Sequence, residues 1–150
     1  MYTDWTANLL VVTVTAATVA LTVLVHYEDL GWLSTRFARS HAPRRRGMLL
    51  AVYGVIALHV IEIWLFGLAT WGLLLHPNAG VLAGQGQAPF LDAIYLSAIT
   101  FTTVGFGDLA PVGSIRFLSG TEALTGFILI TWSASFLYLE MEQLWRSRRG

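Results

Sequence analysis

The sequence contains no cysteine and no lysine, and it has few charged residues of any kind. The absence of cysteine excludes disulfide bonds and thiolate metal sites. Only 12% of the residues are charged and 55% are hydrophobic, whereas about a quarter of the residues of a soluble domain are charged. This balance excludes an ordinary soluble domain and predicts a membrane protein. The sequence shows no catalytic constellation and no phosphate-binding glycine loop, so we expect neither an enzyme nor a nucleic-acid partner.

Three apolar runs are long enough to cross a bilayer, which takes about 20 mostly apolar residues. They cover residues 7–25, 48–75 and 115–141. A signal peptide is the alternative for the first run, but a basic n-region is missing and the apolar stretch is long for one. As a helix, the first run carries a polar stripe on one face, formed by Asn8, Thr15, Thr18 and Thr22. Such a stripe suits packing against a neighbouring helix.

A fourth apolar run, residues 89–101, is too short to cross, because as a helix it would reach only about 20 Å. Pro89 suits the first turn of a helix, and Asp92 suits the positive end of its dipole. Two glycines and two threonines then follow within residues 102–108 and predict irregular backbone. A short apolar helix followed by irregular backbone is typical of a re-entrant segment. We therefore predict an all-α membrane protein with three transmembrane helices, a re-entrant pore helix and a loop.

All nine cations are arginines, and eight of them form two clusters. One cluster lies between the first two spans and the other follows the last span: Arg36, Arg39, Arg44, Arg45 and Arg46, then Arg146, Arg148 and Arg149. The positive-inside rule places both clusters in the cytoplasm, where they can contact anionic lipids. Three spans satisfy this rule with the N-terminus outside, whereas four spans would put one cluster on the wrong side. We predict a multi-pass protein of the cell membrane whose loop at 102–108 faces outward.

The segment between the first two spans has a helical pattern. Leu30, Leu33 and Phe37 share a helical face, so an interfacial amphipathic helix is one interpretation. A solvated basic loop is the other. Together with the first span, this segment makes an N-terminal part, residues 1–47, ahead of a second part, residues 48–150.

Histidine offers a candidate gate at the cytoplasmic end. We expect His26 to emerge from the first span near the charged residues at the end of the chain, and a histidine titrates near neutral pH. Mutual repulsion of positive ends on acidification would then separate the helices, with His26 and His41 as the sensors. The alternative is that the basic ends are held by anionic lipid.

The loop after the short helix has the chemistry of an ion-coordinating surface. Gly105 and Gly107 can adopt backbone dihedrals that are closed to other residues. Alternating handedness would point the carbonyl groups of residues 103–106 in one direction, and a column of such oxygens can replace the water around a cation. Asp108 at the mouth would attract cations. One chain supplies only one strand of oxygens, so a closed ring needs several chains around an axis.

The side chains of this loop have their own expected places. The Thr103 hydroxyl would lie below the carbonyl column, while Val104 and Phe106 would point outward and pack against the short helix. That packing would hold the width of the column.

The stretch "TTVGFGDLAP" resembles the selectivity-filter signature of the potassium-channel superfamily. Residues 48–141 resemble the helix–pore loop–helix module of bacterial two-helix potassium channels, with an outer helix (48–75), a pore helix (89–101) and an inner helix (115–141). The resemblance implies a homotetramer that conducts K⁺ passively, with K⁺ ions in the filter and no organic cofactor. It assigns the filter to Thr103, Val104, Gly105, Phe106 and Gly107, with Thr102 and Asp108 as its supports.

Two positions depart from the commonest pattern of that family. Phe106 stands where tyrosine is most usual, and Ile99 stands where some bacterial channels place a glutamate that holds the aspartate behind the filter. Tyr95, one turn earlier on the pore helix, can offer its hydroxyl to Asp108 instead. The hypothesis is that the filter is less firmly held than in relatives and closes at the filter itself.

Three further residues are gating candidates. Glu62 lies near the middle of the second span with His59 on the same helical face, and a neutral, hydrogen-bonded carboxyl facing another helix is the alternative to a functional carboxylate. We expect Glu122 to hydrogen-bond near the base of the pore helix or to Arg116. Gly126 is either a hinge of the inner helix or a site of close helix packing.

Two rival functions stay open. A non-conducting scaffold or regulatory subunit would use the pore-like segment only for assembly, but assembly alone does not require the glycine spacing of residues 103–108. A poorly selective cation channel is the nearer rival, which Phe106 and Gly107 disfavour by the same resemblance.

Overall fold

The computed structural model describes residues 5–39, 44–84 and 89–149 of the chain. Over these residues the fold is almost entirely helical, and three of the helices are long and apolar enough to cross a membrane. The long helices are α1 (Trp5–Arg39), α2 (Arg44–Leu74) and α4 (Arg116–Arg149), and the short helix is α3 (Pro89–Phe101). The expected class, three apolar spans and one short helix, is confirmed.

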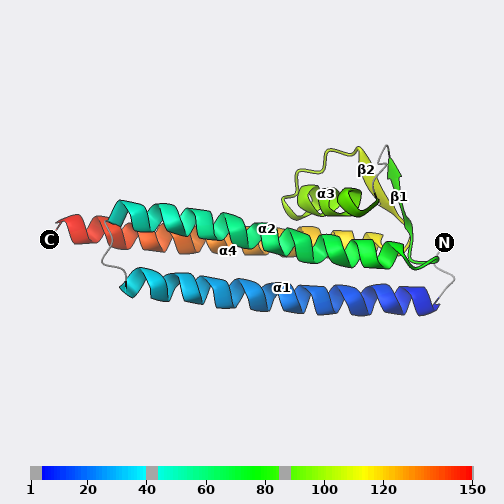
Figure 1. The fold of residues 1–150 in the computed structure, drawn as a ribbon, viewed down its shortest axis with the longest axis horizontal. Coiled ribbons are helices and arrows are strands. Elements are labelled where there is room, and N and C mark those ends of the chain that lie inside the picture. Colours follow the sequence, from blue (N-terminus) through cyan, green and yellow to red (C-terminus); the bar gives the residue numbers. More distant parts are fainter. Residues whose placement is uncertain (1–4, 40–43, 85–88, 150) are drawn as a thin grey trace.

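The three long helices lie side by side, and α3 rests on α2 and α4 near one end of the bundle (Figure 1). Helix α1 begins at the end that carries α3, and the end of α1 and the start of α2 lie at the opposite end (Figure 1). Helix α4 returns to that opposite end. The start of α1 therefore shares its end of the bundle with the loop that follows α3, and both arginine clusters belong to the other end.

Helix α1 is longer than its apolar run. It continues through the basic segment to Arg39 without a break, so the interfacial helix and the solvated loop that we considered for this segment are replaced by one straight helix. Leu30 and Leu33 are buried there and pack against Val55 and Leu58 of α2. The side chain of Phe37 and all of His41 lie outside the described residues.

The polar stripe of the first span faces the bundle as expected. Thr15, Thr18 and Thr22 are buried, and two of them, Thr15 and Thr18, donate their hydroxyls to the carbonyl four residues earlier. Asn8 Oδ1 accepts a hydrogen bond from the hydroxyl of Ser114, just before α4, at 2.6 Å. The first helix is therefore bonded directly to the residues that precede α4, at the end of the bundle that carries α3.

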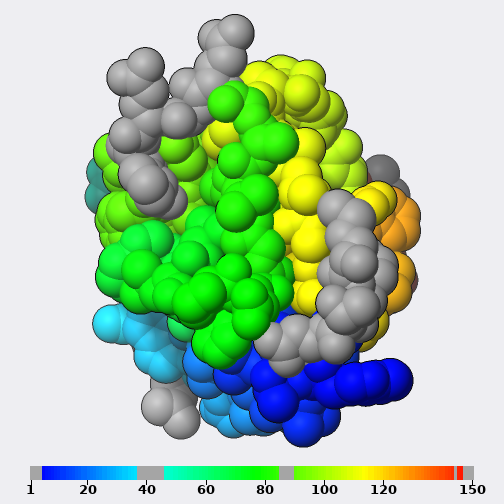
Figure 2. All heavy atoms as spheres, turned by 90° about the vertical axis from the view of Figure 1, so that its right-hand side faces the viewer, coloured from blue at the N-terminus to red at the C-terminus, as the bar shows by residue number. Residues whose placement is uncertain are grey.

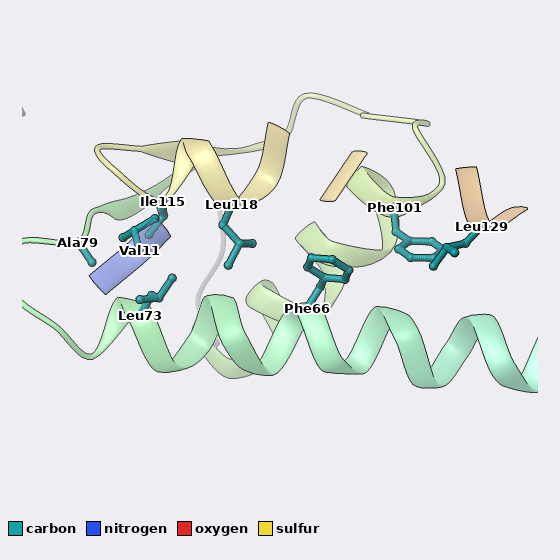
Figure 3. Close-up of a cluster of buried hydrophobic side chains, with 8 residues drawn as sticks. All are labelled: Val11, Phe66, Leu73, Ala79, Phe101, Ile115, Leu118 and Leu129. Carbon is teal, nitrogen blue, oxygen red and sulfur yellow. The ribbon is translucent and has the colours of Figure 1, made fainter. Parts of the chain in front are cut away.

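The main hydrophobic core joins all four helices (Figure 3). Phe66 of α2 and Phe101 at the end of α3 are fully buried, with ring centroids 6.3 Å apart. Val11 of α1 belongs to the same cluster, next to Ile115 (Figure 3). Because lipid is as apolar as these side chains, the gain comes from close packing rather than from removal of water. Helix α1 is thus part of the core of the molecule.

A two-stranded sheet was not predicted. Strand β1 (Val81–Gly84) pairs antiparallel with β2 (Leu109–Val112). Strands of four residues are too short to show a periodicity, and their pairing spans the whole of α3. In the end-on view of Figure 2, β1 lies across the face of the molecule above α1. The sheet holds the chain immediately after the loop at 102–108.

Candidate ion-conducting loop and its supports

The loop at 102–108 is held at its start by the end of α3. The amide of Thr103 donates to the carbonyl of Thr100 at 2.9 Å, and the amide of Gly105 donates to the carbonyl of Ile99 at 3.0 Å. At its other end, the loop passes directly into β2. Both ends of the loop are therefore anchored, while its middle makes no regular secondary structure.

The backbone of the loop alternates in handedness. Thr103, Gly105 and Gly107 have positive φ angles of 59°, 53° and 80°, and none of the residues between them does. The two glycines occupy the positions that the sequence indicated. Thr103 adds a third, and a left-handed conformation costs a residue with a side chain roughly 1–2 kcal/mol. Such strain at a non-glycine residue is characteristic of functional segments.

The two large apolar side chains of the loop are exposed. All residues from 102 to 108 are exposed, and Val104 and Phe106 keep 55% and 71% of their surface accessible. The expectation that these two side chains pack against the short helix is therefore wrong within one chain. Most of the surface of both side chains is left uncovered by the same chain.

A hydrogen bond braces the far end of the loop. The hydroxyl of Tyr95 donates to Oδ2 of Asp108 at 2.8 Å, which confirms the expected replacement for the missing glutamate. This bond to the carboxylate raises the pKa of Tyr95, so the phenol keeps its proton and remains a donor. Ile99, which stands where some bacterial channels place a glutamate, is buried beside Leu96 and Leu109. Apolar packing therefore replaces a polar contact at this position.

If this strut stabilises the loop, Tyr95→Phe should speed the time-dependent decay of ion flux several-fold, because Asp108 loses its only donor from α3 among the described residues. Tyr138→Phe is the matched control, since Tyr138 is an exposed tyrosine of α4. Flux decay is measured in liposomes. Equal decay in Tyr95→Phe and in the unsubstituted chain would show that the bond is not a brace.

Behind the loop, one serine connects three helices. Oγ of Ser97 lies 2.7 Å from the carbonyl oxygen of Ile63 on α2, and it contacts Oε1 of Glu122 on α4. Glu122 is almost fully buried. Its partner lies on the pore helix, one of the two partners expected, and Arg116 is not involved in this bond. Ser97 itself was missed, because a single serine in an apolar helix gives no signal of its partners.

Gly126 is a point of close helix packing. A Cβ atom at this position would lie 2.2 Å from the carbonyl oxygen of Phe101, at the end of α3. No other residue type fits here without moving the pore helix, and α4 runs through Gly126 as one continuous helix. This contact supports close helix packing at Gly126. The end of α3, from which the loop starts, rests on α4 at this residue.

Glu62 is the centre of a buried triad. Its Oε2 lies 2.7 Å from Nδ1 of His59, the partner expected on the same face of α2, and its Oε1 lies 2.7 Å from Nδ1 of His26 on α1. His26 and Glu62 are fully buried. The prediction that His26 emerges at the cytoplasmic end is therefore wrong, because α1 continues well past it. His26 extends the stripe of Thr15, Thr18 and Thr22 by one turn, and that spacing was the available signal.

Comparison with known proteins agrees with this geometry. The sequence profile of an ion-channel family, Ion_trans_2, matches residues 48–142. The chain belongs to this ion-channel family. The match spans α2 from residue 48, α3, the loop, and α4 as far as residue 142, and it leaves out the whole of α1. Membership of the family places the chain among membrane channels and not among enzymes.

Three curated proteins resemble the channel. It is 33% identical to protein LctB of Geobacillus stearothermophilus, over 55% of its own length and 61% of that protein. It is 45% identical to protein LctB of Bacillus caldotenax, over 25% of its own length and 28% of that protein. It is 26% identical to the inward rectifier potassium channel Kirbac3.1 of Paramagnetospirillum magnetotacticum over 74% of its length and 35% of that protein. The channel thus spans less than two thirds of each relative. No solved structure matches it significantly.

Proposed function

We propose that four copies of this channel form one potassium-selective pore, with the loops at 102–108 as the selectivity filter. The observation that carries the proposal is the alternation of positive φ at Thr103, Gly105 and Gly107, in a loop that directly follows a helix too short to span. Backbone of this kind can direct successive carbonyl oxygens toward one axis. The carbonyls of Thr103 to Phe106, with the Thr103 hydroxyl, are the ligands that replace the hydration shell of K⁺.

Assembly of several chains is supported by what a single chain leaves uncovered. Val104 and Phe106 are largely exposed on their own chain, and on α4 the large side chains of Leu124, Phe127 and Ile128 are exposed as well. These residues lie on the helix that packs behind the loop. A ring of chains around an axis through the loops would cover the filter side chains and close the oxygen column.

The orientation in the membrane follows from the arginines. With the arginine-rich ends of the bundle in the cytoplasm, the loop and the start of α1 face outward, and Asp108 lies behind the outer mouth. Anionic headgroups on the cytoplasmic side are the natural partners of the arginine clusters. Of the three relatives, Kirbac3.1 has a name that states its ion, and it is named a potassium channel. This supports K⁺ as the permeant ion.

The test is the flux of K⁺ against Na⁺ through purified protein in liposomes, with Ba²⁺ as a blocker. We expect K⁺ flux to exceed Na⁺ flux by at least about tenfold and to be blocked by Ba²⁺. Equal fluxes would favour a poorly selective cation channel. Absence of any flux at all voltages and pH values would favour a non-conducting scaffold. The mass of the assembly in detergent gives the number of chains independently of conduction.

A further inference from the structure

The triad of His26, His59 and Glu62 has the composition of a metal site. Each residue offers one ligand atom, and these atoms lie within 4.8 Å of one another. Two imidazoles and one carboxylate are the protein ligands of several zinc enzymes, which leave a fourth position open. Neither the ion-channel family match, which leaves out the whole of α1, nor the conduction of K⁺ accounts for this arrangement.

The helices supply the ligands in a pattern that suits metal binding. His59 and Glu62 are three residues apart on α2, so one helical turn presents both side chains, and His26 reaches them from α1. In helical bundles, metals are bound by such paired ligands from one helix together with ligands from a facing helix. The site therefore lies at the contact between the additional helix and the pore module.

The ligand atoms lie close enough together for an ion to bind after the side chains rearrange. The Nδ1 atoms of His26 and His59 each lie 2.7 Å from a different oxygen of Glu62. Ligand atoms of a tetrahedral zinc ion, each bonded at about 2.0 to 2.1 Å, lie about 3.3 Å apart. Binding an ion therefore requires each hydrogen-bonded nitrogen–oxygen pair to separate by on the order of half an ångström. It also requires the more distant ligand atoms, which lie within 4.8 Å of one another, to draw together.

The surroundings give the site an entrance and leave one ring nitrogen without a partner among the described residues. His26 and Glu62 are fully buried, but His59 keeps 17% of its side chain exposed, so an ion would approach from the side of His59. Nε2 of His26 is buried without a hydrogen-bond partner in the described part of the chain, and so is the hydroxyl of Thr22, one turn earlier on α1. A histidine that binds a metal normally donates its second ring nitrogen to such a polar group or to water.

We propose that His26, His59 and Glu62 form a binding site for a divalent transition metal of the Zn²⁺ and Co²⁺ class. Imidazole ligands favour these ions, whereas Mg²⁺ and Ca²⁺ prefer sites built wholly from oxygen. The bound ion ties α1 to α2. It also lies close to the filter, because the His59 ring is 5.9 Å from the ring of Phe101, the last residue of α3.

The experiment titrates Co²⁺ into the purified channel, made with a tag that contains no histidine, and records the visible absorption of the bound ion. The chain has four histidines, and His76 at the end of α2 serves as the control. We expect one Co²⁺ per chain, and we expect His59→Gln or Glu62→Gln to weaken binding by more than about 100-fold, since loss of an outer-shell partner alone costs 10- to 100-fold. His76→Gln should leave binding unchanged.

Two outcomes overturn the proposal. One is that the unsubstituted channel binds no Co²⁺, which would make the triad a hydrogen-bonded contact only. The other is that His59→Gln still binds one ion with the same spectrum, or that His76→Gln loses it. X-ray absorption of the zinc-loaded, unsubstituted channel decides the question without any variant, because two imidazole ligands are expected at about 2.0 Å. Binding is measured without ion flux, so the result is independent of potassium selectivity.

Discussion

Gly105→Ala should abolish potassium-selective flux. Gly105 has a φ of 53°, and an alanine with this φ is destabilised by roughly 1–2 kcal/mol relative to its ordinary conformations. In a ring of four chains the penalty applies at four places around one axis. We expect the backbone to relax to negative φ and to turn a carbonyl away from the pore, so that K⁺ flux falls by at least about tenfold or its excess over Na⁺ flux is lost.

The matched control for this prediction is Gly72→Ala. Gly72 lies in α2, and like Gly105 it has no atom within 4 Å of an added Cβ, but its φ is not positive. The two variants therefore add the same methyl group to open space and differ in backbone conformation. If Gly105→Ala conducts with the K⁺ to Na⁺ ratio of the unsubstituted channel, the alternating backbone does not form the filter.

Gly126→Ala should destabilise the channel and impair conduction. The added Cβ would meet the carbonyl oxygen of Phe101 at 2.2 Å and the Cα of the same residue at 2.9 Å. Neither atom can rotate away, so α4 and the end of α3 must separate. Overpacking of this kind costs about 1–3 kcal/mol, and it acts directly below the loop. We expect a lower melting temperature together with reduced K⁺ flux.

Gly120→Ala on the same helix is the control, because no atom lies within 4 Å of its added Cβ. Alanine is favoured over glycine inside a helix by about 0.5–1 kcal/mol, so Gly120→Ala should be neutral or slightly stabilising. The pair also separates the two hypotheses for Gly126. A hinge without close packing would leave the melting temperature of Gly126→Ala as high as that of Gly120→Ala, while changing only how often the channel opens.

Much of the architecture was predictable because it depends on properties that lie along the chain. The length of each apolar run decides whether a helix can span, and the pore helix Pro89–Phe101 has the bounds that its flanking residues indicated. The contact of Tyr95 with Asp108 was predictable for a similar reason. Both residues belong to one short segment, in which a helix end and the following loop leave little freedom.

Other features depend on how separate helices are rotated and offset against one another. His26 was expected at the membrane surface, yet it lies opposite Glu62, since the end of an apolar run does not mark the end of a helix. The four-residue strands and the bond from Ser97 to Glu122 likewise join segments that are distant in sequence. No local pattern encodes such a partner.

By itself, the sequence determined that this is a membrane protein with three spans, a short helix and a glycine-spaced loop, because hydrophobic length and glycine placement act locally. Only the tertiary structure decided that α1 is bonded into the pore module, that Gly126 supports the end of the pore helix, and that two histidines from different helices meet one glutamate. These contacts depend on how the packed helices are rotated and shifted along their axes relative to one another. That arrangement is set by the close packing of side chains from all of the helices together.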